Sequence, residues 1–416
     1  MCDLNNTECK RFHIQSPDNF LKQQTFIKTK IIEIKMRKYS ERGFKNLEFL
    51  RFLLIWAVVG VHIAYLNLSG AEQFSWLVKW TSGWQAVEMF FLMSGFFLFY
   101  KVRTEETVLH FALRKWLRLA PFIIALTIVG YIAAGFDIMQ YPLSVNIFNS
   151  LLLLDWNTHH FGPDATILYV AWFANALFFV SVIYFCIFKA LGHDKALLAI
   201  GTITFICFYM YSRRVFIVVP FIFPMVRGFA YIGFGILLCE VWKSYTADRK
   251  PETQPKVHPG VSALEAVLLL TIVISLFGGS TGIPTPEGLT VPPDQIATLT
   301  AQTWFPELTR WALDGVWLQI CFVALFWLFL CNRGIISRGL NNPLSVTLGK
   351  YSYAIFLVHT IVIRALRDYV NLPDLKWSYE NPVLLIFLVC IGILAAAVAA
   401  HHLLEQPLTR WANSKL

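Results

Sequence analysis

Residues 47–68 read LEFLRFLLIWAVVGVHIAYLNL, a nearly unbroken apolar run that is long enough to cross a hydrocarbon core of about 30 Å as one helix. Comparable runs recur along the chain, and we predict ten spans, at residues 47–68, 83–100, 116–135, 167–189, 195–212, 217–240, 261–278, 311–331, 351–370 and 382–403. The composition agrees, because 56% of the 416 residues are hydrophobic and only 15% are charged. The sequence therefore predicts an all-α fold, a polytopic membrane helix bundle.

The distribution of Lys and Arg predicts the orientation of the bundle. The formal net charge is +9, and basic residues concentrate in alternate gaps between the spans, at 101–118, 243–256 and 333–350, whereas residues 279–309 contain none. By the positive-inside rule the basic face is cytoplasmic, and an even number of spans puts both termini there. The basic residues do not form one patch with interleaved aromatics, which argues against a nucleic-acid partner.

The organisation outside the spans is simple. Residues 1–46 are polar and basic without the apolar segment of a signal peptide, so we expect a cytoplasmic extension in which Met36 is a second possible translation start. The transmembrane domain is predicted at 47–410, followed by a short cytoplasmic tail at 411–416. The apolar stretch 145–154 is too short to cross and is interpreted as a re-entrant or interfacial segment on the outer face. The eight cysteines lack metal-site spacing, so we expect no metal centre.

Two ionisable residues lie in the first span. An ionisable side chain at the centre of a membrane helix costs about 2.5–3.5 kcal/mol, so each one calls for a structural or functional reason. His62 lies eleven positions after Arg51, which is about 16 Å along a helix and close to three full turns. Both side chains are therefore expected on one face, with Arg51 near the cytoplasmic edge and His62 in the outer half.

Glu88 in the second span is expected at a depth similar to that of His62. A carboxylate beside an imidazole fixes its tautomer and stabilises the imidazolium, as a general base acting on a hydroxyl requires. The alternative is a His–Glu pair that only locks two helices together. Arg227, near the outer end of the sixth span, would pair with Glu88 or contact an acceptor.

Small and basic residues mark two further positions. Ser94 and Gly95 would allow close helix approach or supply a hydroxyl, and packing is the more common role of such pairs. Arg114 and Arg118 are four residues apart and share one helix face, a geometry suited to the phosphates of a nucleotide-type donor such as coenzyme A. The alternative for this pair is a positive-inside anchor.

His359 in the ninth span, nearer mid-membrane than His62, is a secondary candidate whose alternative role is a helix–helix hydrogen bond. Polar residues of two outer segments are candidates for acceptor contacts, with a solvated loop as the alternative: Asp155, His159, His160, Asp164, Arg213 and Arg214.

Five sequence elements, in this order, resemble the acyltransferase-3 family of membrane O-acyltransferases. They are Arg51 with His62, the segment Glu88 to Phe96, the basic element Arg114 to Arg118, the segment Gly349 to His359, and Glu405-Gln406-Pro407. Together they cover roughly residues 44–410. The fourth span departs from the pattern: Trp172 is present, but the acidic residue of the family's Trp-Ser-Leu-x-x-Glu version is missing.

The resemblance implies an acyltransferase that uses acetyl-CoA or another acyl-CoA as donor, with no bound cofactor, in the bacterial cytoplasmic membrane. The acceptor would be a cell-surface or exported carbohydrate, either a polysaccharide or a lipid-linked glycan. His62 would be the catalytic residue, as general base or acyl carrier, supported by Glu88, and Arg51, Arg114 and Arg118 would bind the donor. Secondary site residues are His359, Ser94, Trp172 and Arg227.

Two other functions fit a polar-lined bundle. A transporter or flippase of a polysaccharide precursor would move its substrate without consuming acyl-CoA. A polyprenyl-phosphate-sugar glycosyltransferase should have an acidic pair in the first outer loop, but Glu72 is the only acidic residue among residues 69–82. Neither gives a reason for basic residues at one depth and a histidine at the other.

Overall fold

The computed structural model describes residues 44–64, 83–100, 102, 105–135, 137–153, 166–212, 217–218, 221–247, 256–277, 316–368 and 382–415. Its main compact unit comprises Phe44–Glu240 and Gln254–Leu416, and a second unit comprises Met1–Gly43 and Val241–Thr253. Most of the predicted N-terminal extension and all six outer-segment candidates for acceptor contacts lie outside the described residues.

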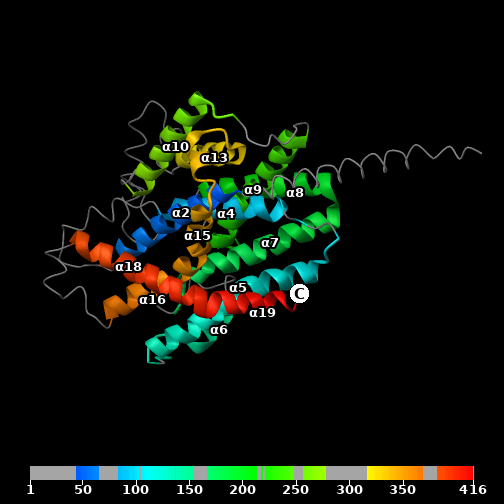
Figure 1. The fold of residues 1–416 in the computed structure, drawn as a ribbon. Coiled ribbons are helices and arrows are strands. Elements are labelled where there is room, and N and C mark those ends of the chain that lie inside the picture. Colours follow the sequence, from blue (N-terminus) through cyan, green and yellow to red (C-terminus); the bar gives the residue numbers. More distant parts are fainter. Residues whose placement is uncertain are drawn as a thin grey trace, which may run out of the picture. The chain divides into compact units, whose positions relative to one another are not determined.

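The described chain is built from helices (Figure 1). They are α2 (Lys45–Ala64), α4 (Gly83–Tyr100), α5 (Val108–Ala133), α6 (Leu143–Ser150), α7 (Trp172–Leu191), α8 (His193–Ser212), α9 (Phe223–Ala247), α10 (Pro259–Phe277), α13 (Val316–Cys331), α14 (Ile335–Gly339), α15 (Pro343–Lys350), α16 (Ser352–Asp368), α18 (Pro382–Ala400) and α19 (Gln406–Asn413). The 3₁₀ turn η4 (Tyr169–Ala171) precedes α7, and the π turn η6 (His401–Glu405) joins α18 to α19. Strands β1 (Ile217–Val218) and β2 (Phe221–Ile222) pair antiparallel, with Ile217 opposite Ile222.

Each of the ten predicted spans contains a helix, but the sixth was predicted to begin too early: residues 217–218 and 221–222 are the paired strands β1 and β2, and α9 begins only at Phe223. Eight helical runs are long and apolar enough to cross a membrane, and two shorter apolar helices, Gln85–Tyr100 and Trp317–Cys331, occupy the second and eighth predicted spans. The all-α polytopic fold is therefore confirmed. The eight residues of α6 extend about 12 Å, which agrees with the prediction that 145–154 does not cross.

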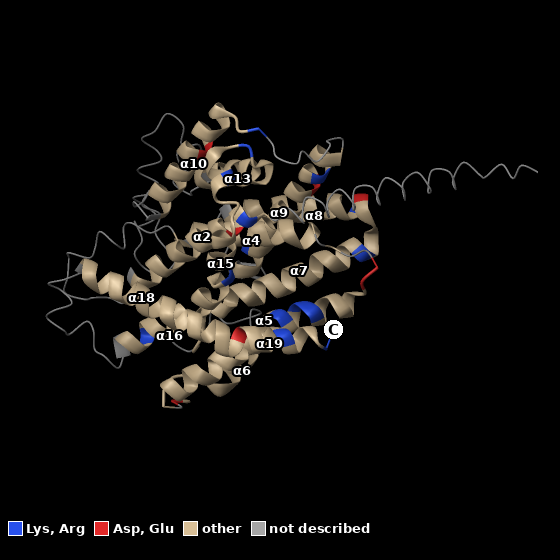
Figure 2. Ribbon diagram, viewed as in Figure 1, with Lys and Arg blue, Asp and Glu red and all other residues tan. Residues whose placement is uncertain are grey.

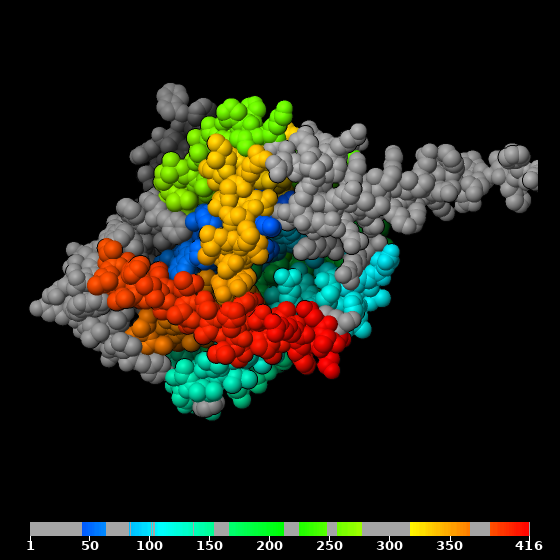
Figure 3. All heavy atoms as spheres, in the orientation of Figure 1, coloured from blue at the N-terminus to red at the C-terminus, as the bar shows by residue number. Residues whose placement is uncertain are grey.

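Two helix ends differ from the hydropathy pattern. Helix α5 begins at Val108 rather than at 116, because the side chain of Thr107 accepts a hydrogen bond from the backbone N–H of His110 and caps the helix. Helix α18 continues through the π turn into α19, and Figure 3 shows the two running over one face of the molecule. The π turn ends at Glu405, two residues before Pro407, which has no backbone N–H to donate, so the wider turn lies where regular hydrogen bonding is interrupted.

Helix α2 lies inside the bundle and packs against α4, α15 and α16. Of its most apolar segment, 56% is buried, compared with 17% for α10. Figure 2 shows few charged residues along the described helices, and Lys and Arg of α5 and α19 gather toward the C-terminus of the chain. The outward faces of the peripheral helices are apolar, as lipid contact requires: examples are Leu198, Phe205, Val267, Leu270, Phe387 and Ile391.

Two glycines allow α4 and α9 to approach each other closely. A Cβ atom on Gly95 would lie 2.0 Å from the carbonyl oxygen of Ile232, and one on Gly235 would lie 2.0 Å from that of Leu92. Each glycine therefore faces the backbone of the other helix. Close backbone contact through small residues is how membrane helices gain packing energy without a hydrophobic driving force.

We predict that Gly95→Ala lowers the free energy of unfolding by about 1–3 kcal/mol, because the added methyl group must push two backbones apart. The matched control is Gly392→Ala in α18, where a Cβ would meet nothing within 4 Å, and which should be neutral or slightly stabilising. Thermal unfolding in detergent, followed by intrinsic fluorescence, measures both variants. Equal stability of the two would contradict the proposed close packing.

Candidate active site

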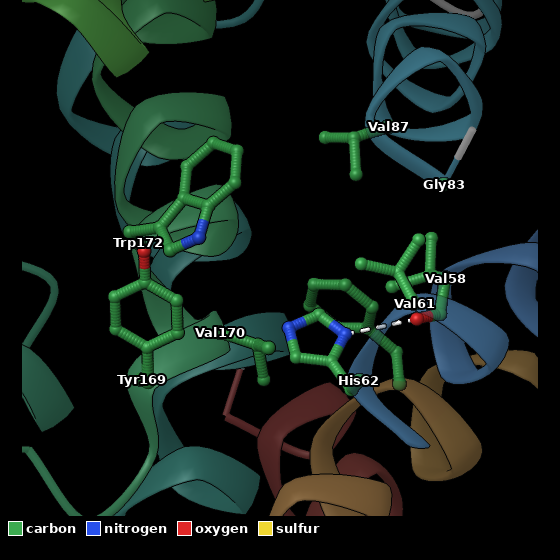
Figure 4. A pocket seen from close by; sticks show the side chains of 9 residues that line it. Val58, Val61, His62, Gly83, Val87, Tyr169, Val170 and Trp172 are labelled. Carbon is green, nitrogen blue, oxygen red and sulfur yellow. Dashed lines mark hydrogen bonds between the residues drawn. The ribbon is translucent and has the colours of Figure 1, made fainter. Parts of the chain in front are cut away.

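His62, in the last turn of α2, lines a pocket between α2, α4, the η4–α7 junction and α16. Its Nδ1 lies 2.8 Å from the carbonyl oxygen of Val58, which can only accept, so Nδ1 carries the proton and Nε2 carries a lone pair. Figure 4 shows this second nitrogen facing the side of the pocket formed by Tyr169 and Trp172. His62 is therefore held as the tautomer that a general base acting through Nε2 needs.

The rest of the pocket wall is apolar or aromatic. The lining residues other than His62 are Val58, Val61, Gly83, Val87, Tyr169, Val170, Trp172 and Phe356. The hydroxyl of Tyr169 and the indole N–H of Trp172 are the polar groups that these side chains add. A wall of this kind excludes water and strengthens the electrostatic effect of the few polar groups it contains.

The ring of His359, from α16, lies against the ring of His62. The two centroids are 4.8 Å apart and the planes meet at 66°, so the rings are in edge contact. His359 is completely buried, and its Nδ1 donates to the carbonyl oxygen of Ile355 at 3.0 Å. The two histidines are 297 residues apart in sequence, but their rings are in contact, and both are held with the proton on Nδ1.

Buried amides hold the η4 turn that carries Tyr169. The backbone N–H of Ile167 donates to Asn146 Oδ1 at 2.7 Å, and Asn149 Nδ2 donates to the carbonyl oxygen of Leu168 at 3.0 Å. Asn175 of α7, itself fully buried, donates to Asn149 Oδ1 at 3.2 Å. Non-helical backbone inside a bundle requires such partners, so α6 supports one wall of the pocket.

Glu88 lies in a separate buried cluster. Its Oε1 is 3.3 Å from Arg227 NH2, and both side chains are 2% exposed. The hydroxyl of Tyr211 and the amide of Gln319 also donate to the carboxylate, and Gln319 Nε2 lies 2.6 Å from the hydroxyl of Tyr231. The pairing of Arg227 with Glu88, one of two alternatives, is therefore present. The part of Glu88 in catalysis stays a prediction; among the described residues, His359 is a titratable group in contact with the ring of His62.

Trp172 connects the pocket to this cluster. Its side chain lines the pocket, and the guanidinium carbon of Arg227 lies 5.7 Å from the centre of its ring. This distance is within the range of a cation–π contact. The secondary candidates Trp172 and Arg227 therefore touch each other, whereas Ser94 lies in α4 beside the packing contact of Gly95.

The three predicted donor-binding arginines gather at the N-terminal halves of α2 and α5. Arg51 NH1 lies 3.0 Å from Glu48 Oε1, and Arg114 makes a bidentate pair with Glu106 at 2.8 and 2.7 Å. Arg118 lies near enough to Arg51 and Arg114 to be repelled by them, and near enough to Glu48 and Glu405 to be attracted by them. It is exposed, and no carboxylate of the described residues lies within ion-pair distance of it. An anion would meet three guanidinium groups here, one of them unpaired within the described chain.

Comparison with known families decides the class of the protein. A family model described as an acyltransferase domain, that of the acyltransferase-3 proteins, matches residues 44–402. The chain belongs to the acyltransferase-3 family. This acyltransferase-3 protein is thus an acyltransferase with multiple membrane-crossing helices. Neither a search of curated proteins nor a search of solved structures found a match.

The acyltransferase-3 match covers every candidate site residue, from Arg51 to His359. Several site residues of this acyltransferase were not predicted: Tyr169, Phe356, Tyr211, Tyr231 and Gln319. Gln319 carried a usable signal, because it is the one amide in the apolar helix α13. The aromatic residues carried none, since aromatic side chains are common throughout these spans.

Proposed function

We propose that this acyltransferase transfers an acyl group, most readily acetyl, from cytoplasmic acyl-CoA to a hydroxyl of an exported or cell-surface carbohydrate. The bacterial cytoplasmic membrane is the proposed location. The proposal depends on two residues of α2. Arg51 lies near one end of the helix and belongs to the arginine cluster, and His62 lies near the other end and lines the pocket. One rigid helix thereby connects a group of cations to a base.

The proposed reaction uses His62 as general base. Its Nε2 takes the proton of the acceptor hydroxyl while the hydroxyl oxygen forms a bond to the thioester carbon. The C–S bond then breaks, its electron pair goes to sulfur, and the imidazolium returns the proton to the thiolate. A variant passes the acyl group through His62 itself. General base catalysis contributes about 10²–10⁴-fold to such reactions.

The donor would enter from the arginine end. Glu48 and Glu106 hold the guanidinium groups of Arg51 and Arg114 in place, and guanidinium groups are suited to bind phosphate through paired hydrogen bonds. The axial distance of about 16 Å between Arg51 and His62 is of the order that an extended pantetheine arm bridges. The thioester would then reach the pocket while the nucleotide stays at the arginines.

We predict that Arg118→Ala raises the apparent KM for acetyl-CoA about tenfold and changes kcat less than about threefold. Loss of a charged hydrogen bond costs about 1.5–3 kcal/mol, and this one would be made equally in the ground and transition states. Initial rates at varied acetyl-CoA concentration measure the effect. Lys195→Ala removes an exposed cation of α8 and serves as the control. An unchanged KM would remove Arg118 from the donor site.

The experiment that tests the function compares cells with and without the protein. Glycan of the deletion strain should lack an acyl group that the parent strain carries, as seen by mass spectrometry. Membrane vesicles containing the protein should transfer label from acetyl-CoA to the glycan fraction and release free CoA. Movement of a glycan across the membrane without release of CoA would contradict the proposal.

A further inference from the structure

His359 has a feature that packing does not explain. Its side chain is completely buried, and its Nε2 has no hydrogen-bond partner among the described residues. Nδ1 donates to the carbonyl oxygen of Ile355, so Nε2 is a lone-pair acceptor. Buried acceptors without a partner are uncommon, because the lost hydrogen bonds to water are not replaced.

An apolar residue would serve a purely structural role better at this position. The ring of Phe356 lies near His359, with 6.2 Å between the ring centroids. The carbonyl of Ile355, which accepts the hydrogen bond of Nδ1, belongs to the same helix as His359, so this bond does not join two helices. A leucine would fill the space without leaving a polar atom unsatisfied. The one polar ring in contact is that of His62, at 4.8 Å. The ring of His359, whose acceptor nitrogen has no partner among the described residues, therefore lies against the proposed base.

We propose that His359 is a positioning residue that stabilises the charged form of His62 during acyl transfer. This inference rests on the proposed function, in which His62 gains a proton. A fully buried imidazole without a counter-ion is neutral, and its lone-pair nitrogen is the negative end of its dipole. The bond from Nδ1 to Ile355 fixes that dipole before the reaction begins. A preorganised dipole stabilises developing charge without reorganisation.

The role of His359 differs from that of the carboxylate in a catalytic triad. The hydrogen bond that orients His62 runs from its Nδ1 to the carbonyl oxygen of Val58, and His359 contributes a contact between ring edges. When the acceptor O–H bond breaks and the proton goes to His62 Nε2, the positive charge appears next to His359. When the proton passes to the CoA thiolate, both rings are neutral again. His359 neither gains nor loses a proton in this cycle.

The kinetic test uses His359→Leu in membrane vesicles of the protein's own cells, with labelled acetyl-CoA as the probe. We expect the maximal rate per protein to fall about 10²-fold, as for loss of one preorganised stabilising group, and the apparent KM for acetyl-CoA to change less than about threefold. His359→Gln keeps an acceptor near the position of Nε2 and should restore at least about a tenth of the wild-type rate. Thr360→Val alters the same turn of α16 and is the control. An unchanged rate in His359→Leu, or a Gln variant no better than Leu, would overturn the inference.

A stability test does not depend on turnover. If Nε2 has no partner in the resting protein, His359→Leu should unfold at the same temperature as the wild type or a higher one. A lower unfolding temperature, restored in His359→Gln, would show that Nε2 is already partnered and would overturn the inference. The proposed function fails separately, if wild-type vesicles transfer no label or if His62→Ala is fully active.

Discussion

His62→Ala is expected to lower acyl transfer by about 10³-fold or more, because it removes the group that takes the proton of the acceptor hydroxyl. The substitution should leave the fold intact, since His62 lies at the end of α2 and the carbonyl of Val58 remains within the helix. Label transferred from acetyl-CoA to the glycan fraction of membrane vesicles measures the loss. His258→Ala, in the exposed segment before α10, is the matched control.

The same variant separates two chemical routes. If the acyl group passes through His62, brief exposure to labelled acetyl-CoA should label the wild-type protein and leave His62→Ala unlabelled. If the hydroxyl attacks the thioester directly, neither protein is labelled although the wild type turns over. Turnover by His62→Ala at the wild-type rate would remove His62 from the reaction altogether.

Glu88→Ala is expected to lower the free energy of unfolding by about 3–5 kcal/mol, because Arg227 would remain as a buried charge without its carboxylate. Arg227→Met should cost a similar amount for the same reason. The double variant Glu88→Leu with Arg227→Met removes both charges, so it should be less destabilised than the sum of the single changes. Denaturation in detergent measures all three proteins.

Two further variants sharpen the test of this cluster. Glu88→Gln keeps an acceptor for Tyr211 and Gln319 and should lie between wild type and Glu88→Ala. Asp194→Ala, on the exposed start of α8, should have little effect on stability. If Glu88→Ala is as stable as the wild type but inactive, Glu88 acts in catalysis, and its ion pair with Arg227 between α4 and α9 is not its main role.

The helical framework could be predicted because lipid imposes a simple rule on sequence. Apolar runs of sufficient length mark helices, and each of the ten predicted spans contains one, although the apolar residues 217–222 include the strands β1 and β2. The helix ends were less predictable where polar residues continue a helix beyond the apolar run. The first turns of α5 contain Arg114 and Lys115, and the side chain of Lys115 is held by Ser181 Oγ at 2.7 Å. Hydropathy does not register such a contact between helices.

The candidate site was predicted in its parts, but not in its pairings. The spacing of Arg51 and His62 follows from helix geometry, and Arg118 lies near Arg51, while a common donor site stays a prediction. Helix periodicity specifies which face a residue occupies without naming the helix opposite. The sequence therefore allowed Glu88 to lie near His62 and also to pair with Arg227, and the contact of His62 with His359 depends on the packing of α2 against α16.

Helix α2 carries both ends of the proposed reaction path, and this restricts how its sequence can change. Deleting one residue between Arg51 and His62 would shorten the path by about 1.5 Å and turn His62 by about 100° relative to Arg51. Side chains along the helix can be exchanged without such a rotation, and loops can gain or lose residues without moving either group. Insertions and deletions should therefore be tolerated almost anywhere on the surface of this protein before they are tolerated in the ten positions between Arg51 and His62.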